Sequence, residues 1–109
     1  MMNLMSQTKN EFGLTQREME VTIQILRARP EVRRVHIFGS RAKGTFHAGS
    51  DVDLAIMDTN ADRQLLQRLA SDFQESSLPY FVDVVNYHSL ENQAFKDHID
   101  RVGKVFYSR

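Results

Sequence analysis

Residues 39–56 read GSRAKGTFHAGSDVDLAI, and this stretch carries the strongest signals for both the fold and the chemistry. Its last part alternates between acidic and aliphatic residues, which predicts a strand. Because successive side chains of a strand point to opposite faces, Asp51 and Asp53 project one way and Val52 and Leu54 the other. The segment therefore predicts a strand with one apolar face and one acidic face.

The same alternation recurs in YFVDVVNY, residues 80–87, which predicts another strand. The valines on either side of Asp83 share one face, and Asp83 shares the other with Phe81 and Val85. If the apolar faces of both strands meet the helices, all three aspartates lie on the open face of the sheet. Phe81 and Val85 would then leave apolar surface there, as at a binding site or partner contact, unless the C-terminal tail covers them.

The remainder of the chain supplies helices and one further strand. Thr15 and Glu18 form a capping-box pattern that begins a first helix, and Pro30 ends it. The segment RRVHIF, residues 33–38, predicts a strand that runs into the glycine–serine pair. Helical spacing marks a second helix and a third that is capped by Ser89; their apolar residues are Leu65, Leu66, Leu69, Ala70 and Phe73, then Phe95, Ile99 and Val102.

The order of the predicted elements is α-β-β-α-β-α, followed by a short extended tail, KVFYS. Strands interleaved with helices favour an α/β or α+β fold in which helices pack on one face of a small mixed sheet. The 109 residues fit a single domain, 1–109, and the polar, irregular residues 1–13 are expected to be loosely held.

The composition excludes several classes of function. Lys plus Arg and Asp plus Glu both number 14, so a balanced charge argues against direct binding to duplex nucleic acid, which usually needs a basic stripe. Without cysteine there is no disulfide framework and no thiolate metal site. No apolar run has the length of a membrane span, and MMNLMSQTKN lacks a signal-peptide core, so we expect a cytoplasmic protein with no membrane partner. The four histidines are dispersed and form no metal constellation; they are His36, His47, His88 and His98.

The pair of acids Asp51 and Asp53 favours the binding of a cation. Two carboxylates about 4 Å apart repel each other by roughly 4 kcal/mol at an effective dielectric near 20. Mg²⁺ removes that cost, since it favours one or two carboxylates together with substrate phosphates. Asp83 would complete a two-metal site with Asp51 and Asp53, of the kind that clamps both oxygens of an in-line displacement.

The glycine–serine pair offers the other half of a phosphate site. Gly39 allows close approach of the backbone, and the hydroxyl of Ser40 adds a donor. Arg41 and Lys43 bring positive charge nearby, although either could point to solvent. Ser50 could position Asp51, or it could be an ordinary turn residue.

Residues 39–53 follow the pattern Gly-Ser, ten residues, Asp-x-Asp, which resembles the nucleotidyltransferase superfamily that includes DNA polymerase β. The compact length and the form GSRAKG…GSDVDLAI are similar to its minimal members, the MNT or antitoxin-type domains, over roughly residues 15–105. The resemblance implies a polymerase β palm-like fold. Nothing in the chain resembles the acceptor-binding or finger domains of larger members.

The resemblance also implies roles for the matching residues. Gly39 and Ser40 would bind the triphosphate of ATP or another nucleoside triphosphate. Asp51 and Asp53 would ligate both of two Mg²⁺ ions. Asp83 would bind the catalytic metal and help to deprotonate the acceptor hydroxyl.

A partner follows from the resemblance as well. Minimal members are typically encoded beside a small helical HEPN protein, so the resemblance implies an antitoxin that adenylylates and silences a HEPN ribonuclease toxin within a hetero-oligomer. Two alternatives stay open: nucleotidyl transfer to a small molecule, as in aminoglycoside-modifying relatives, and a catalytically silent nucleotide-binding subunit. The lack of an acceptor domain weighs against the first alternative, and the presence of all three acids weighs against the second.

Overall fold

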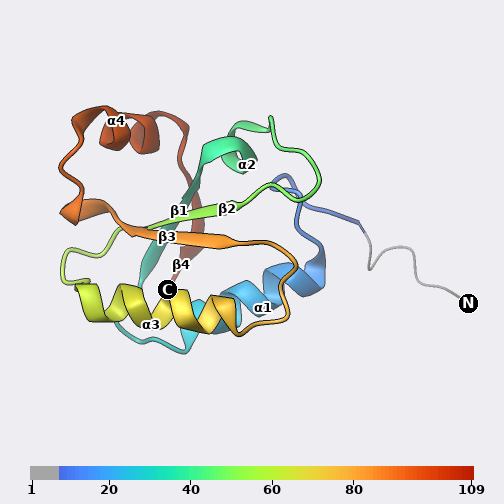
Figure 1. The fold of residues 1–109 in the computed structure, drawn as a ribbon, viewed down its shortest axis with the longest axis horizontal. Helices are drawn as coiled ribbons and strands as arrows, with labels where there is room; N and C mark the ends of the chain where they lie inside the picture. The colour runs from blue at the N-terminus through green and yellow to red at the C-terminus, as the bar shows by residue number, and fades with distance from the viewer. Residues whose placement is uncertain (1–7) are drawn as a thin grey trace, which may run out of the picture.

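The computed structural model describes residues 8–109 and contains a mixed sheet of four strands (Figure 1). The strands are β1 (Arg34–Phe38), β2 (Val52–Ile56), β3 (Val82–Asn86) and β4 (Lys104–Ser108), in the order β3-β2-β1-β4. β1 is antiparallel to both β2 and β4, whereas β2 and β3 are parallel. The predicted fold class is therefore confirmed, and the tail KVFYS is a paired edge strand.

Four helices accompany the sheet: α1 (Gln16–Arg27), α2 (Gly39–Lys43), α3 (Arg63–Gln74) and α4 (Gln93–Val102). The predicted capping box at the start of α1 is present, with Thr15 and Glu18 bonding each other's backbone N–H groups. Asp62 caps α3. No helix in residues 8–109 is both long and apolar enough to cross a membrane.

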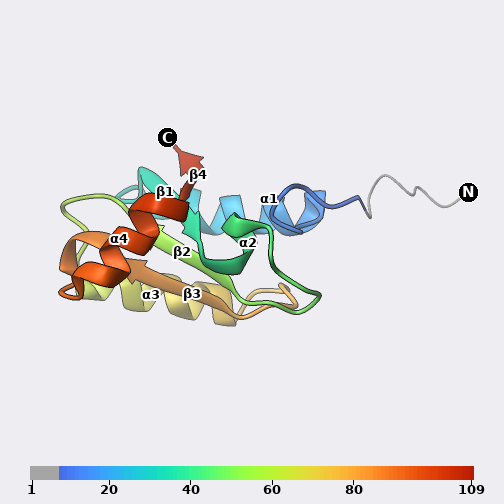
Figure 2. The same cartoon turned by 90° about the horizontal axis from the view of Figure 1, so that it is seen from above.

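The sheet has helices on both faces (Figure 2). The faces of β1, β2 and β3 that carry Val35, Leu54 and Val82 pack against α1 and α3 in the main core. The opposite face packs against α4, where Ile99 meets Phe38 and Ala55. The expectation of helices on one face thus holds for α1 and α3 but not for α4, which covers part of the face expected to be open.

Two local expectations also differ from the structure. Ser89 does not cap the last helix: it ends a 3₁₀ turn, η2 (Tyr87–Ser89), and Asn92 caps α4. Residues 1–7 of the segment expected to be loosely held lie outside the described residues. Residues 8–13 are anchored, because Phe12 is buried in the core and the Asn10 side chain accepts hydrogen bonds from the backbone N–H groups of Phe12 and Leu14.

Candidate active site

Three carboxylates meet where the parallel strands β2 and β3 begin. Asp53 and Asp83 are direct neighbours in the register of the two strands, so their side chains lie on the same face. Asp51 stands one residue before β2 begins and projects the same way as Asp53. Asp51 and Asp83 are exposed, whereas Asp53 is half-buried between them and the sheet. The structure therefore brings all three predicted acids together.

Asp51, Asp53 and Asp83 together form an acidic cluster. Within this cluster, the environment of Asp53 disfavours its ionised form. Its pKa is raised from the ordinary 3.8 to about 6, first by burial, then by the negative charges of Asp83 and Asp51, while Arg41 acts in the opposite direction. Neither ion pair of residues 8–109 involves any of the three acids. The cluster is thus a site of uncompensated negative charge that a cation would stabilise.

Gly39 leaves room for the central carboxylate. It has a φ of 71°, in the left-handed region, and a Cβ placed on it would lie 2.3 Å from Oδ2 of Asp53. Any larger residue would push the carboxylate away from the start of α2. The glycine of the Gly-Ser pair is therefore needed for the position of Asp53, a link between two halves of the motif that the sequence alone did not reveal.

A cavity of about 350 Å³ opens beside the acids. Its lining residues are Ser40, His47, Gly49, Ser50, Asp51 and Asp53. The hydroxyl of Ser50 accepts a hydrogen bond from the backbone N–H of His47 and so closes the loop before Asp51. Sequence reasoning missed His47 and Gly49, whose only signal was their place between α2 and the acidic pair.

From the sequence, Arg41 could contact the triphosphate or point to solvent, and the structure shows that it is buried instead. Arg41 is only 2% exposed, and its guanidinium group donates hydrogen bonds to the backbone carbonyls of Phe12, Gly13 and Ser50. It does not line the cavity beside the acids. Lys43 is exposed and does not line that cavity either, so a phosphate contact from Lys43 stays a prediction.

The donor set fits Mg²⁺. Within residues 8–109, no three acidic or histidine side chains are arranged as a complete metal-binding group. The three aspartates supply hard carboxylate oxygens, which Mg²⁺ takes one or two at a time together with phosphate oxygens and water. Asp51, Asp53 and Asp83 would hold the metal, and a bound cation would offset the burial and the neighbouring charges that raise the pKa of Asp53.

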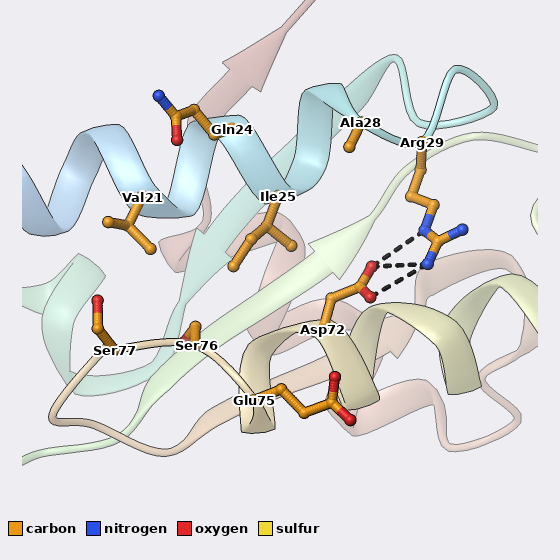
Figure 3. A pocket seen from close by; sticks show the side chains of 9 residues that line it. All are labelled: Val21, Gln24, Ile25, Ala28, Arg29, Asp72, Glu75, Ser76 and Ser77. Carbon is orange, nitrogen blue, oxygen red and sulfur yellow. Dashed lines mark hydrogen bonds and ion pairs between the residues drawn. The ribbon is translucent and has the colours of Figure 1, made fainter.

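A larger hollow lies elsewhere, between α1 and α3 (Figure 3). This groove of about 560 Å³ contains none of the three acids. Its one ionic link joins Arg29 to Asp72 at 3.0 Å, with both side chains partly exposed. The groove therefore lies apart from the acidic cluster, on the opposite face of the sheet.

The chain is similar to known nucleotidyltransferases. Residues 20–109 match the family model described as "Polymerase beta, Nucleotidyltransferase". Over 93 residues the chain is 31% identical to the "Probable protein adenylyltransferase MntA" of Haemophilus influenzae, with 84% of this chain and 81% of that protein covered.

Solved structures agree with this likeness. A crystal structure of a toxin–antitoxin with AMP-PNP is 27% identical at a TM-score of 0.68, covering 84% of this chain and 73% of that one. A complex of a tri-AMPylated HEPN toxin of Shewanella oneidensis with an MNT antitoxin has a TM-score of 0.54 and covers 84% and 70%. Its identity of 23% supports a similarity of fold alone.

The position of Gly39 gives a first prediction. Gly39→Ala and Gly44→Ala both place a side chain at left-handed φ, 71° and 82°, so each should lose roughly 1–2 kcal/mol of stability in urea unfolding. Only the Cβ at Gly39 meets Asp53, since nothing lies within 4 Å of a Cβ at Gly44. Gly39→Ala alone should therefore weaken Mg²⁺-dependent binding of an ATP analogue, by about 10–100-fold in calorimetry. Equal affinities of the two variants would show that Gly39 does not position Asp53.

The pKa of Asp53 gives a second prediction. With a folded-state pKa of about 6 and an ordinary value of 3.8, the folded protein binds more protons than the unfolded chain between about pH 4 and 6. Stability due to Asp53 therefore falls as the pH rises through this window. Asp53→Asn removes that loss, so in chelator the variant should exceed the wild type in stability above pH 6 and converge with it toward pH 4. Urea unfolding across this range measures the difference, and a constant offset at every pH would contradict it.

Proposed function

The chain belongs to the polymerase β nucleotidyltransferase family, and from that premise we propose that it transfers AMP from ATP, with Mg²⁺, to a hydroxyl group of a partner protein. The observation that carries the proposal is the acidic cluster beside the cavity that contains Ser40. We place the reaction in the cytoplasm, where ATP is available as substrate.

The proposed chemistry is an in-line displacement at the α-phosphorus of ATP. Bound Mg²⁺ ions would neutralise the triphosphate and the acidic cluster. The hydroxyl of Ser40 would donate to a phosphate oxygen, and Asp51 and Asp53 would hold the triphosphate through the metal site. Asp83 would accept the proton of the acceptor hydroxyl at a carboxylate oxygen. The acceptor oxygen forms a bond to phosphorus, the bond to the β-phosphate oxygen breaks, and pyrophosphate leaves with the electron pair.

The acceptor is proposed to be a protein. The edge strand β3 presents Asp83 next to Phe81, whose side chain is 67% exposed, and a hollow of about 340 Å³ lies between this edge and α3. Exposed apolar surface beside a reactive carboxylate suits a macromolecular acceptor, which would cover it on docking. Val85, expected to be exposed beside Phe81, is instead half-buried among residues that pack with α4.

The identity of the partner is proposed from the relatives. The similar Haemophilus influenzae protein is named a protein adenylyltransferase, and similar folds occur in toxin–antitoxin complexes, one with an AMPylated HEPN toxin. We accordingly propose a helical HEPN-type partner in a hetero-oligomer, with this chain as the antitoxin whose AMP transfer to a hydroxyl side chain, tyrosine for example, silences the partner's ribonuclease activity.

Intact-mass measurement tests the proposal. The wild type, incubated with ATP, Mg²⁺ and a HEPN-type protein with which it forms a complex, should add the mass of one or more AMP groups to that protein. Asp53→Asn should slow the transfer by orders of magnitude, because each 1.4 kcal/mol of lost transition-state stabilisation costs about a factor of ten. Asp72→Asn is the matched control, since it removes a carboxylate on the opposite face and should leave the rate unchanged.

Two outcomes would contradict the proposal. If the partner binds but gains no mass while a small-molecule hydroxyl is modified, the acceptor is a small molecule. If ATP binds and neither acceptor is modified at any Mg²⁺ concentration, the chain is a silent nucleotide-binding subunit.

A further inference from the structure

The guanidinium group of Arg41 is buried without an acidic partner. Arg41 is 2% exposed, and neither of the two ion pairs within residues 8–109 includes it. Burying a charged group costs free energy unless hydrogen bonds and other favourable electrostatic contacts replace its hydration. The contacts that replace water around Arg41 therefore show what this side chain holds together.

Backbone carbonyls from two distant segments accept its hydrogen bonds. Nη1 donates to the carbonyl oxygens of Phe12 at 2.7 Å and Gly13 at 3.3 Å. Nε and Nη2 both donate to the carbonyl oxygen of Ser50, at 3.1 and 2.8 Å. One planar group thus joins the segment before α1 to the residue before Asp51.

Two aromatic rings complete its surroundings. The guanidinium carbon lies 4.3 Å from the ring centre of Tyr80 and 5.2 Å from that of Phe46. Such cation–π contacts favour a guanidinium group that is cut off from water. Phe46 belongs to the loop between α2 and β2, and Tyr80 lies just before β3, so both rings belong to segments that lead into the two strands that carry the acids.

We propose that Arg41 is a positioning residue. By donating hydrogen bonds to the Ser50 carbonyl and stacking beside Tyr80, it fixes the direction in which the chain enters β2 at Asp51 and the direction in which it approaches β3 before Asp83. This role rests on the proposed nucleotidyl transfer at the acidic cluster. Arg41 acts through the backbone carbonyls that it binds, beside the smaller effect of its charge on Asp53, and it does not line the cavity beside the acids. Because Arg41 also binds the carbonyls of residues 12–13, these residues help to hold it in place beside the active site.

The role needs the forked shape of arginine as well as its charge. A lysine ammonium is a compact point charge, so it cannot reach the carbonyls of Phe12 and Ser50 in the same fixed geometry. Gly13 is a second position at which a substitution would disturb the contacts of Arg41. Its φ is 75°, and a Cβ there would lie 2.8 Å from Nη1 of Arg41 and 2.3 Å from the ring of Phe46.

The test uses three full-length variants: Arg41→Lys, Gly13→Ala and, as a matched control, Arg29→Lys. Arg29 also joins distant elements, through Asp72, but on the face away from the acids. Three quantities are measured for each: urea stability, hydrogen exchange of residues 44–52, and the Mg²⁺ concentration that gives half-maximal binding of a non-hydrolysable ATP analogue. Hydrogen exchange reports on the loop, and the Mg²⁺ requirement reports on the acids. Both are measured separately from the global stability.

We expect Arg41→Lys and Gly13→Ala to accelerate exchange in residues 44–52 and to raise the Mg²⁺ requirement by about tenfold or more. Arg29→Lys should change neither. If Arg41→Lys does not fold, Gly13→Ala carries the same comparison.

Folded Arg41→Lys or Gly13→Ala with a wild-type Mg²⁺ requirement would overturn the proposal, and so would an equal rise in Arg29→Lys, which would indicate a general loss of stability. A wild type that binds no nucleotide with Mg²⁺ would instead refute the proposed function itself, and with it this positioning role.

Discussion

The fold holds Asp53 half-buried beside two other carboxylates, and its neighbouring elements keep this acid in place. The parallel register of β2 and β3 places Asp53 directly beside Asp83, and the approach to β2 adds Asp51. Burial, together with the negative charges of Asp83 and Asp51, raises the pKa of Asp53 to about 6. A fold that holds three acids this way loses stability at a site whose negative charge a bound cation would neutralise, as strained functional sites commonly do.

The surrounding elements hold the acids in place. The apolar side of β2, with Val52 and Leu54, is locked into the main core between α1 and α3, so the polar side cannot turn away. Gly39 leaves the space that the Asp53 carboxylate occupies. On the other side, α4 covers the part of the acidic face beyond Ala55 and leaves the start of the strands open. The site is therefore as much a product of the core as of the motif.

Much of this arrangement could be predicted from the sequence, because strand periodicity is local information. The alternation around Asp51, Asp53 and Asp83 was sufficient to place the three acids on one face. The burial of Arg41 could not be predicted, since it depends on backbone carbonyls 28 and 29 residues earlier in the chain. Nor could the placement of α4 on the acidic face, because an amphipathic pattern shows that a helix has an apolar side but not which face of the sheet receives it.

We infer that the acidic cluster binds a cation, and the ionisation of Asp53 tests this inference most directly. The carboxyl carbon of Asp53 can be followed by NMR as the pH is varied, first in chelator and then with Mg²⁺ and a non-hydrolysable ATP analogue. We predict a midpoint of about 6 without the metal and a value well below that with Mg²⁺ and nucleotide bound. A midpoint near 3.8 in chelator, or one that Mg²⁺ and nucleotide leave unchanged, would contradict it.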